Sequence, residues 1–242
     1  MKKIYKKMLV AGAAMALAGV AQAQSAGSNM VSFGWMRIMP TGHSEFLTVD
    51  SIGGMPLGVQ KPNTGATIDS ADTLGLTFAH YFTDNISAEF VFGVPPTHNV
   101  SGDRGYEKYG KLGEVRQWSP AVVAKWHFFD AKTKFRPFVG LGVNYTWFTD
   151  EKVTNQAFIK NEFLGIGTSM SASAKSSWNP VFTAGANYAV TDNWFVGFSV
   201  SYVPIATTAS FTTTLANGAQ IQSHTKIKID PVVTYLSVGY RF

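Results

Sequence analysis

Four charged residues of this 242-residue chain lie in stretches that otherwise alternate between bulky apolar and small residues. Charged side chains in such stretches are suited to form ion pairs inside an enclosed space. The four residues are Glu89, Lys125, Arg136 and Arg241. Each lies on the small-residue face of its stretch, opposite the bulky apolar side chains. Opposite charges that share such a face can neutralise one another, so we expect a lumen charge network that plugs one end of the space. A charge-selective ion path is the sharper alternative.

Catalytic chemistry finds little support among the other reactive side chains. The chain has no cysteine, which excludes disulfides, Cys-ligated zinc and thiol nucleophiles. No HExxH motif occurs, and no motif joins a histidine to a serine nucleophile. The five histidines are His43, His80, His98, His127 and His224. We therefore expect no enzyme activity, no metal site and no cofactor.

Alternation at period two predicts the elements that position these residues. Along Thr73–Phe82, for example, Leu74, Leu76 and Phe78 share one face, and threonine, glycine and alanine fill the other. A first strand is expected near Val31–Met39, although Arg37 makes its facing ambiguous because it shares parity with the aromatic residues. The eight predicted strands cover residues 31–39, 73–82, 86–94, 121–128, 136–147, 182–190, 194–202 and 232–242.

Three observations place membrane lipid against the bulky faces of these strands. The opposite faces carry glycine, alanine, serine and threonine rather than the lysine and glutamate of a water-facing sheet. The four charges all fall on the small-residue faces, as the cost of charge in lipid requires. The connections alternate between short ones (83–85, 130–134, 191–193) and long ones (40–72, 95–111, 149–177, 206–226). The sequence therefore predicts an all-β fold, an eight-stranded antiparallel transmembrane β-barrel with short periplasmic turns and long extracellular loops. A secreted β-sandwich is the alternative.

The N-terminal segment is typical of an export signal. Lysines 2, 3, 6 and 7 precede an apolar run over residues 8–20, and Ala21-Gln22-Ala23 supplies a cleavage site. The run has 13 residues, too short for a helix that needs about 20 to cross a bilayer. We expect residues 1–23 to be removed and residues 24–242 to form one barrel domain in the bacterial outer membrane. Removal lowers the formal charge from +5 to 5 − 4 = +1, which leaves no basic surface for nucleic acid.

Several phrases in the chain resemble the OmpW family of small outer-membrane barrels, which includes the alkane-uptake protein AlkL. These phrases are Leu74-Gly75-Leu76-Thr77-Phe78, Tyr81-Phe82-Thr83-Asp84-Asn85-Ile86, the run from Lys134 to Tyr145, Asp230-Pro231 and Val238-Gly239-Tyr240-Arg241-Phe242. The resemblance implies a narrow apolar channel that passes small hydrophobic molecules and releases them sideways through the wall. It also implies bulky apolar gates in the lumen, a role that Val91 fits and Ser201 does not. The terminal strand implies an assembly signal at Val238, Tyr240 and Phe242, read by the barrel-assembly machinery.

The interior of an eight-stranded barrel is just wide enough for side chains, so a general water-filled pore is not expected. Inward parity gives the channel-lining candidates Val91, Val123, Phe138, Val233 and Tyr235. Proline cannot donate to a strand ladder, so a lateral opening is expected near one or more of Pro120, Pro137, Pro180 and Pro204. The expected partners are outer-membrane lipid, lipopolysaccharide and small hydrophobic solutes. The alternative function is a structural or adhesive barrel, or a receptor, acting through its outer loops.

Overall fold

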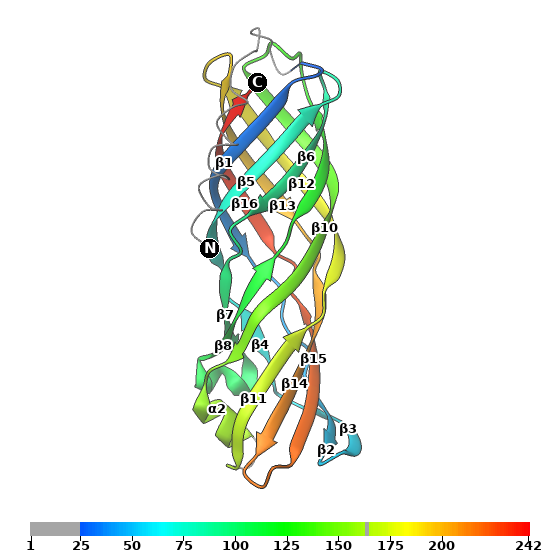
Figure 1. Ribbon diagram of the computed structural model, residues 1–242, viewed down its shortest axis with the longest axis vertical. Coiled ribbons are helices and arrows are strands. Elements are labelled where there is room, and N and C mark those ends of the chain that lie inside the picture. The colour runs from blue at the N-terminus through cyan, green and yellow to red at the C-terminus, as the bar shows by residue number, and fades with distance from the viewer. Residues whose placement is uncertain (1–24, 163–164) are drawn as a thin grey trace, which may run out of the picture.

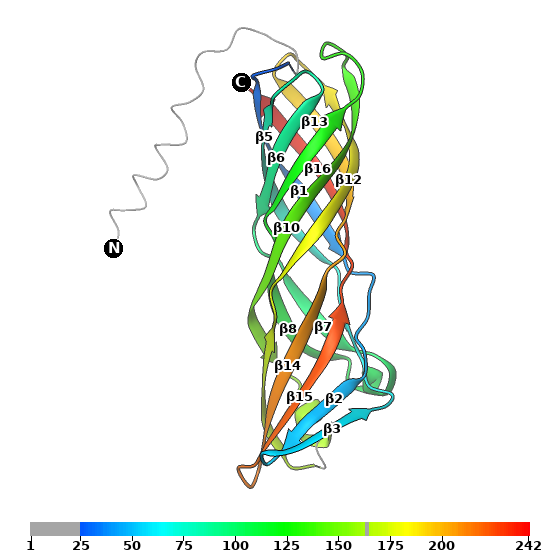
Figure 2. The same ribbon diagram turned by 90° about the vertical axis from the view of Figure 1, so that its right-hand side faces the viewer.

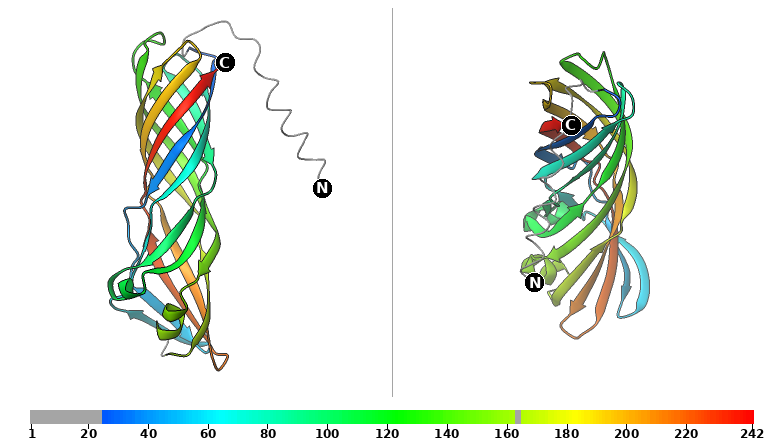
Figure 3. Two further views of the ribbon diagram at one scale, coloured as in Figure 1. Left: turned by 90° about the vertical axis from the view of Figure 1, so that its left-hand side faces the viewer. Right: turned by 45° about the horizontal axis from the view of Figure 1, so that its top comes forward.

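Eight antiparallel strands close into a barrel in the computed structural model, which describes residues 25–162 and 165–242 (Figure 1). The barrel strands are β1 (Asn29–Met39), β5 (Ala71–Tyr81), β6 (Ile86–Gly93), β9 (Ala121–His127), β10 (Phe135–Val153), β12 (Ser177–Ala189), β13 (Trp194–Tyr202) and β16 (Val232–Arg241). Pairing of β16 with β1, from Met30↔Arg241 to Met39↔Val232, completes the ring (Figure 3, left). The predicted fold class is confirmed. The expected signal segment, residues 1–23, lies outside the described residues.

The faces of the strands follow the predicted parity. Large apolar side chains such as Leu141, Phe198 and Leu236 are exposed on the outside, as contact with hydrocarbon requires. Closure leaves no sheet edge whose backbone groups would lack partners in lipid. The ambiguity of β1 is resolved with Arg37 outward, where its guanidinium lies 3.0 Å from a carboxylate oxygen of Asp72. Of the residues that the structure describes, none forms a helix with the length and apolar character to cross a bilayer.

The long connections fold into further strands that extend the barrel at the end opposite to the short turns and the C-terminus (Figures 1 and 2). Its strands are β2 (Leu47–Ile52), β3 (Met55–Lys61), β4 (Ala66–Ile68), β7 (Thr97–Gly102), β8 (Lys111–Trp118), β11 (Gly167–Ala174), β14 (Ala206–Leu215) and β15 (Gln220–Lys228). Two short helices, η1 (Arg104–Tyr109) and α2 (Gln156–Glu162), pack beside them. We call this part the extension. Strand β10 is shared, because its second half pairs with β8 and β11.

Candidate functional site: two cavities in one tube

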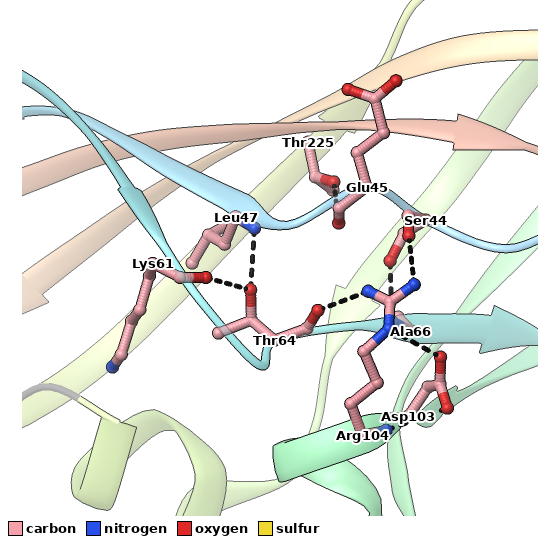
Figure 4. Close-up of polar contacts among 9 residues, drawn as sticks. All are labelled: Ser44, Glu45, Leu47, Lys61, Thr64, Ala66, Asp103, Arg104 and Thr225. Carbon is pink, nitrogen blue, oxygen red and sulfur yellow. Dashed lines mark hydrogen bonds and ion pairs between the residues drawn. The ribbon is translucent and has the colours of Figure 1, made fainter.

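A short strap closes the wall of the extension. The strap, Ser44–Leu47, joins β15 on one side to β4 on the other (Figure 4). The Glu45 amide donates to the carbonyl of Lys226 at 2.8 Å, and the amide of Ala66 donates to the Ser44 hydroxyl at 2.8 Å. Since β4, β7, β8, β10, β11, β14 and β15 pair in turn, the strap turns them into a second closed ring.

Arg104 fastens this strap from inside η1. Its guanidinium donates to the carbonyl of Thr64 at 2.6 Å and to that of Ser44 at 3.1 Å (Figure 4). A second clasp holds the helices, because Glu162 accepts hydrogen bonds from both Lys61 and Tyr106. Burial, followed by the hydrogen bond to Glu162, raises the pKa of Tyr106, so its phenol stays protonated. The mouth of the extension is therefore a built structure.

We expect Arg104→Gln to loosen the strap without unfolding the barrel. Hydrogen bonds to a charged group contribute about 1.5–3 kcal/mol each, so local opening of the strap becomes easier by roughly that amount. Hydrogen exchange of the amides of residues 44–47 measures the change. Arg37→Gln is the control, because its half-exposed ion pair is worth only about 0–1 kcal/mol. Equal exchange in both variants would refute a fastening role for Arg104.

The extension encloses an outer cavity of about 120 Å³ with almost wholly apolar walls. Val100, Phe148, Met170, Phe211 and Ile227 contribute to its lining from five different strands. An apolar lining of this kind suits apolar molecules, as an apolar cavity of about 150 Å³ elsewhere holds benzene.

An inner cavity of about 100 Å³ lies within the barrel. Four of the predicted channel-lining residues, Val91, Val123, Val233 and Tyr235, line it. The fifth, Phe138, is not among the lining residues and lies among polar side chains instead. Its ring centroid is 4.3 Å from the ammonium of Lys125 and 5.5 Å from the ring of His127. Phe138 lies nearer to the periplasmic end of β10 than Gly140, the next inward-facing residue. Its ring therefore lies towards the periplasmic end of the lumen.

Buried apolar residues, which we call the neck, lie between the two cavities. Ile229 lines the outer cavity and Ile205 the inner one, and both are 1% exposed. The backbone amide of Ile229 donates to the carbonyl of Ile205 at 2.8 Å, so the two residues are fixed side by side. They belong to a buried cluster with Val115, Ala121, Val123, Phe148, Val181 and Val203. Ile205 and Ile229 lie outside the predicted strands, one of which ends at residue 202 and the other of which begins at residue 232, so strand parity does not identify them.

An ion pair lies at the floor of the inner cavity. The carboxylate of Glu89 and the ammonium of Lys125 are 2.5 Å apart, and both side chains are buried. The two arginines of the predicted network lie nearer the turns. Arg136 donates to the carbonyls of Asp84 at 2.5 Å and of Phe128 at 3.4 Å. Arg241 donates to the carbonyl of Asp192. The four charged side chains thus lie from the floor of the inner cavity to the periplasmic turns.

Three of the four predicted prolines lie beside two gaps in the strand pairing of the barrel wall, and the fourth lies in an uninterrupted ladder. The first break separates β6 from β9: their pairing ends at Val91↔Ala121. The next backbone hydrogen bond runs from the amide of Gln117 to the carbonyl of Pro96 at 3.0 Å, beside the Thr97↔Arg116 pair of β7 and β8. Pro120 borders it, together with Pro95 and Pro96, which the sequence analysis did not single out. We call it the β6–β9 break.

The second break separates β12 from β13. Pairing with β13 ends at Phe182↔Tyr202, and the next rung is Ala174↔Ala209 between β11 and β14. Pro180 and Pro204 lie within this β12–β13 break. Pro137, by contrast, pairs with Ala186 in an uninterrupted ladder near the periplasmic turns.

The remaining predicted residues lie as follows. Val238, Tyr240 and Phe242 share the parity of the lipid face of β16, and Tyr240 packs edge-on against Trp194 with ring centroids 5.0 Å apart. Ser87 and His127 share a hydrogen bond of 2.8 Å in the buried floor, but the other ring nitrogen of His127 has no partner among the described residues. A triad needs an orienting group at that nitrogen. Within residues 25–162 and 165–242, no cluster of His, Asp and Glu has the makings of a metal site.

Comparison with known proteins gives one consistent result. The profile described as OmpW family matches residues 25–242. Outer membrane protein W of Escherichia coli is 33% identical over 239 residues, which is 98% of this chain and 100% of that protein. Outer membrane protein AlkL of Ectopseudomonas oleovorans is 28% identical over 192 residues, 79% of this chain and 74% of that protein. The crystal structure of OprG from Pseudomonas aeruginosa superposes with a TM-score of 0.77 at 28% identity, covering 91% of this chain and 99% of that one.

Proposed function

This chain belongs to the OmpW family of bacterial outer-membrane barrels, which are not enzymes, and on that premise we propose that it passes small hydrophobic molecules through the tube. The solute enters the outer cavity, passes the neck into the inner cavity and leaves sideways through a break in the wall. The relationship to AlkL supports a hydrophobic cargo.

The outer cavity is the observation that carries the proposal. Its lining is almost wholly apolar, and it lies in the extension, beyond the membrane part of the barrel, where a dilute solute would be collected from water. Burying roughly 200 Å² of apolar surface there contributes about 5 kcal/mol at about 25 cal/mol per Å². That is enough to extract a dilute solute, yet weak enough for it to move on. The closed second ring keeps lipid away from this surface.

The floor of the lumen supports a sideways exit. Below the inner cavity the solute meets the Glu89–Lys125 pair and the arginines that hold the periplasmic turns. An apolar molecule gains nothing by displacing these contacts, because their charges would lose partners in a low-dielectric interior. The wall beside the inner cavity offers an alternative, since Ala121 at the edge of the β6–β9 break and Val181 at that of the β12–β13 break both line the cavity.

Filling the outer cavity tests the proposal directly. Ala209 is buried and lines that cavity, so Ala209→Trp should place an indole in the passage. We expect uptake of a radiolabelled alkane by cells that carry the variant to fall towards that of cells without the protein. Ala124→Trp is the matched control, because Ala124 lies on the lipid face of β9 and should leave uptake unchanged. Normal uptake by a folded Ala209→Trp barrel would exclude passage through this cavity.

A further inference from the structure

Asn144 is a buried polar residue that lines the inner cavity beside the β6–β9 break. It is 3% exposed, and its neighbours across the ladders are Ala121 on β9 and Asn179 on β12. An amide group has two donor hydrogens and an acceptor oxygen with two lone pairs. An isolated amide in the wall of an apolar passage would be costly, so its hydrogen bonds indicate its role.

The nitrogen of Asn144 binds the broken strand. Nδ2 donates to the carbonyl of Ser119 at 3.0 Å and to that of Pro120 at 3.2 Å. Its oxygen accepts from the hydroxyl of Thr146 at 2.6 Å and from the amide of Asn179 at 3.2 Å. All the bonding capacity of the side chain is therefore satisfied, half of it by the link between β8 and β9.

The side chain of Ser119 also forms hydrogen bonds inside the lumen. Its hydroxyl lies 3.0 Å from that of Thr146 and accepts a hydrogen bond of 2.8 Å from the amide of Gln117. Ser119 is thus tied by carbonyl and hydroxyl alike to groups inside the lumen. These ties hold it on the β10 side of the wall, away from β6.

The carbonyl of Ser119 has an obvious alternative partner on β6. Continuing the register of Val91↔Ala121 by two residues sets Ser119 opposite Gly93. The amide of Val94 donates to β5, at the carbonyl of Leu74, and successive amides of a strand point to opposite sides. The amide of Gly93 therefore points to the β9 side. No backbone hydrogen bond in the described chain joins it to Ser119, although unpaired amides in a membrane wall are expensive.

We propose that Asn144 keeps the β6–β9 break open by capturing the carbonyl that would otherwise pair with Gly93. Asn144 is then a positioning residue for the exit: it lines the inner cavity, but it acts on the wall through the carbonyl of Ser119. This inference rests on the proposed function only in its last step, that solute leaves through this break.

The test measures the break separately from transport. Ala121→Cys places the only thiol of the chain at the edge of the break, facing the inner cavity. A maleimide carried on a phospholipid acyl chain, and thus confined to the bilayer, reaches this thiol only through the wall. In this background, Asn144→Leu removes both donors and acceptor, and Asn144→Asp removes the donors alone. Asn179→Leu is the control, because it removes one bond to the Asn144 oxygen and leaves the bonds to Ser119 and Pro120.

We expect labelling to fall about fivefold or more in both Asn144 variants, the effect of shifting one hydrogen bond between two partners. Asn179→Leu should label at the parent rate. Labelling at or above the parent rate in folded Asn144→Leu and Asn144→Asp barrels would overturn the inference. Heat-modifiable mobility on gels shows which variants are folded.

Alkane uptake by the same variants, with alanine restored at position 121, separates the two proposals. If labelling and uptake fall together, Asn144 shapes the exit that the solute uses. If labelling falls and uptake persists, Asn144 holds the break as inferred, but the solute leaves elsewhere. If uptake falls while labelling does not, Asn144 acts within the passage and the inference is wrong.

Discussion

A disulfide across the β6–β9 break should stop uptake. Extending the register of Val91↔Ala121 by one residue sets Phe92 opposite Pro120. Phe92→Cys/Pro120→Cys places two thiols where a closed ladder would bring Cα atoms to within about 4.5–5.5 Å, a separation that a disulfide can bridge. Oxidation then draws the two strands together and seals the wall. We expect alkane uptake to fall to the level of cells without the protein and to recover on addition of reductant.

The control disulfide joins the same two strands two residues nearer to the periplasmic turns. Phe90 and Val122 are paired in the intact ladder, so Phe90→Cys/Val122→Cys adds a disulfide without changing the break. The chain has no other cysteine, which makes each bond unambiguous. Full uptake through the oxidised Phe92→Cys/Pro120→Cys barrel would show that the solute does not leave here. The corresponding experiment would then move to the β12–β13 break.

The second large effect concerns the stability of the floor. Lys125→Met leaves the carboxylate of Glu89 buried without its partner, which costs about 3–5 kcal/mol of unfolding free energy. Replacing both residues, as Glu89→Gln/Lys125→Met, removes the stranded charge, and we expect most of the loss to be recovered. Urea unfolding in lipid vesicles measures the three free energies.

Arg116→Gln provides the comparison. Its guanidinium lies 2.8 Å from a carboxylate oxygen of Asp150, but both side chains are nearly half exposed. The expected loss is therefore only about 0–1 kcal/mol. A Lys125→Met loss as small as that of Arg116→Gln would mean that water reaches the floor. The plug in the periplasmic half of the lumen would then be leaky, and the case for a sideways exit would weaken.

The barrel could be predicted from sequence because lipid imposes one rule on every strand that crosses it. Bulky apolar residues must lie outside, so runs such as Leu74, Leu76 and Phe78 give both the strand and its facing. The same rule placed Glu89 and Lys125 inside together. It could not show that Arg136 and Arg241 bind the carbonyls of the turns, since those bonds depend on where the backbone turns.

The extension escaped prediction because no such rule acts beyond the membrane. Strand β14, from Ala206 to Leu215, is mainly threonine, alanine and serine on both faces, so alternation of size is weak. The strap has the same difficulty: Ser44 joins β15 to β4 through contacts between residues far apart in sequence. Asn144 shares the inward parity of Arg136 and Phe138 along the predicted strand 136–147. Its bonds to Ser119 and Pro120 required the three-dimensional position of the break.

Strand β10 is long enough to carry the wall of the tube well beyond the membrane. At about 3.3 Å per residue its 19 residues extend about 60 Å, or roughly 45 Å along the axis at a tilt of about 40°, whereas the apolar band of such barrels is about 25 Å tall. Some 20 Å of wall therefore projects from the bilayer. A molecule that enters at the rim would thus travel inside a protein wall well before it reaches the depth of the hydrocarbon layer.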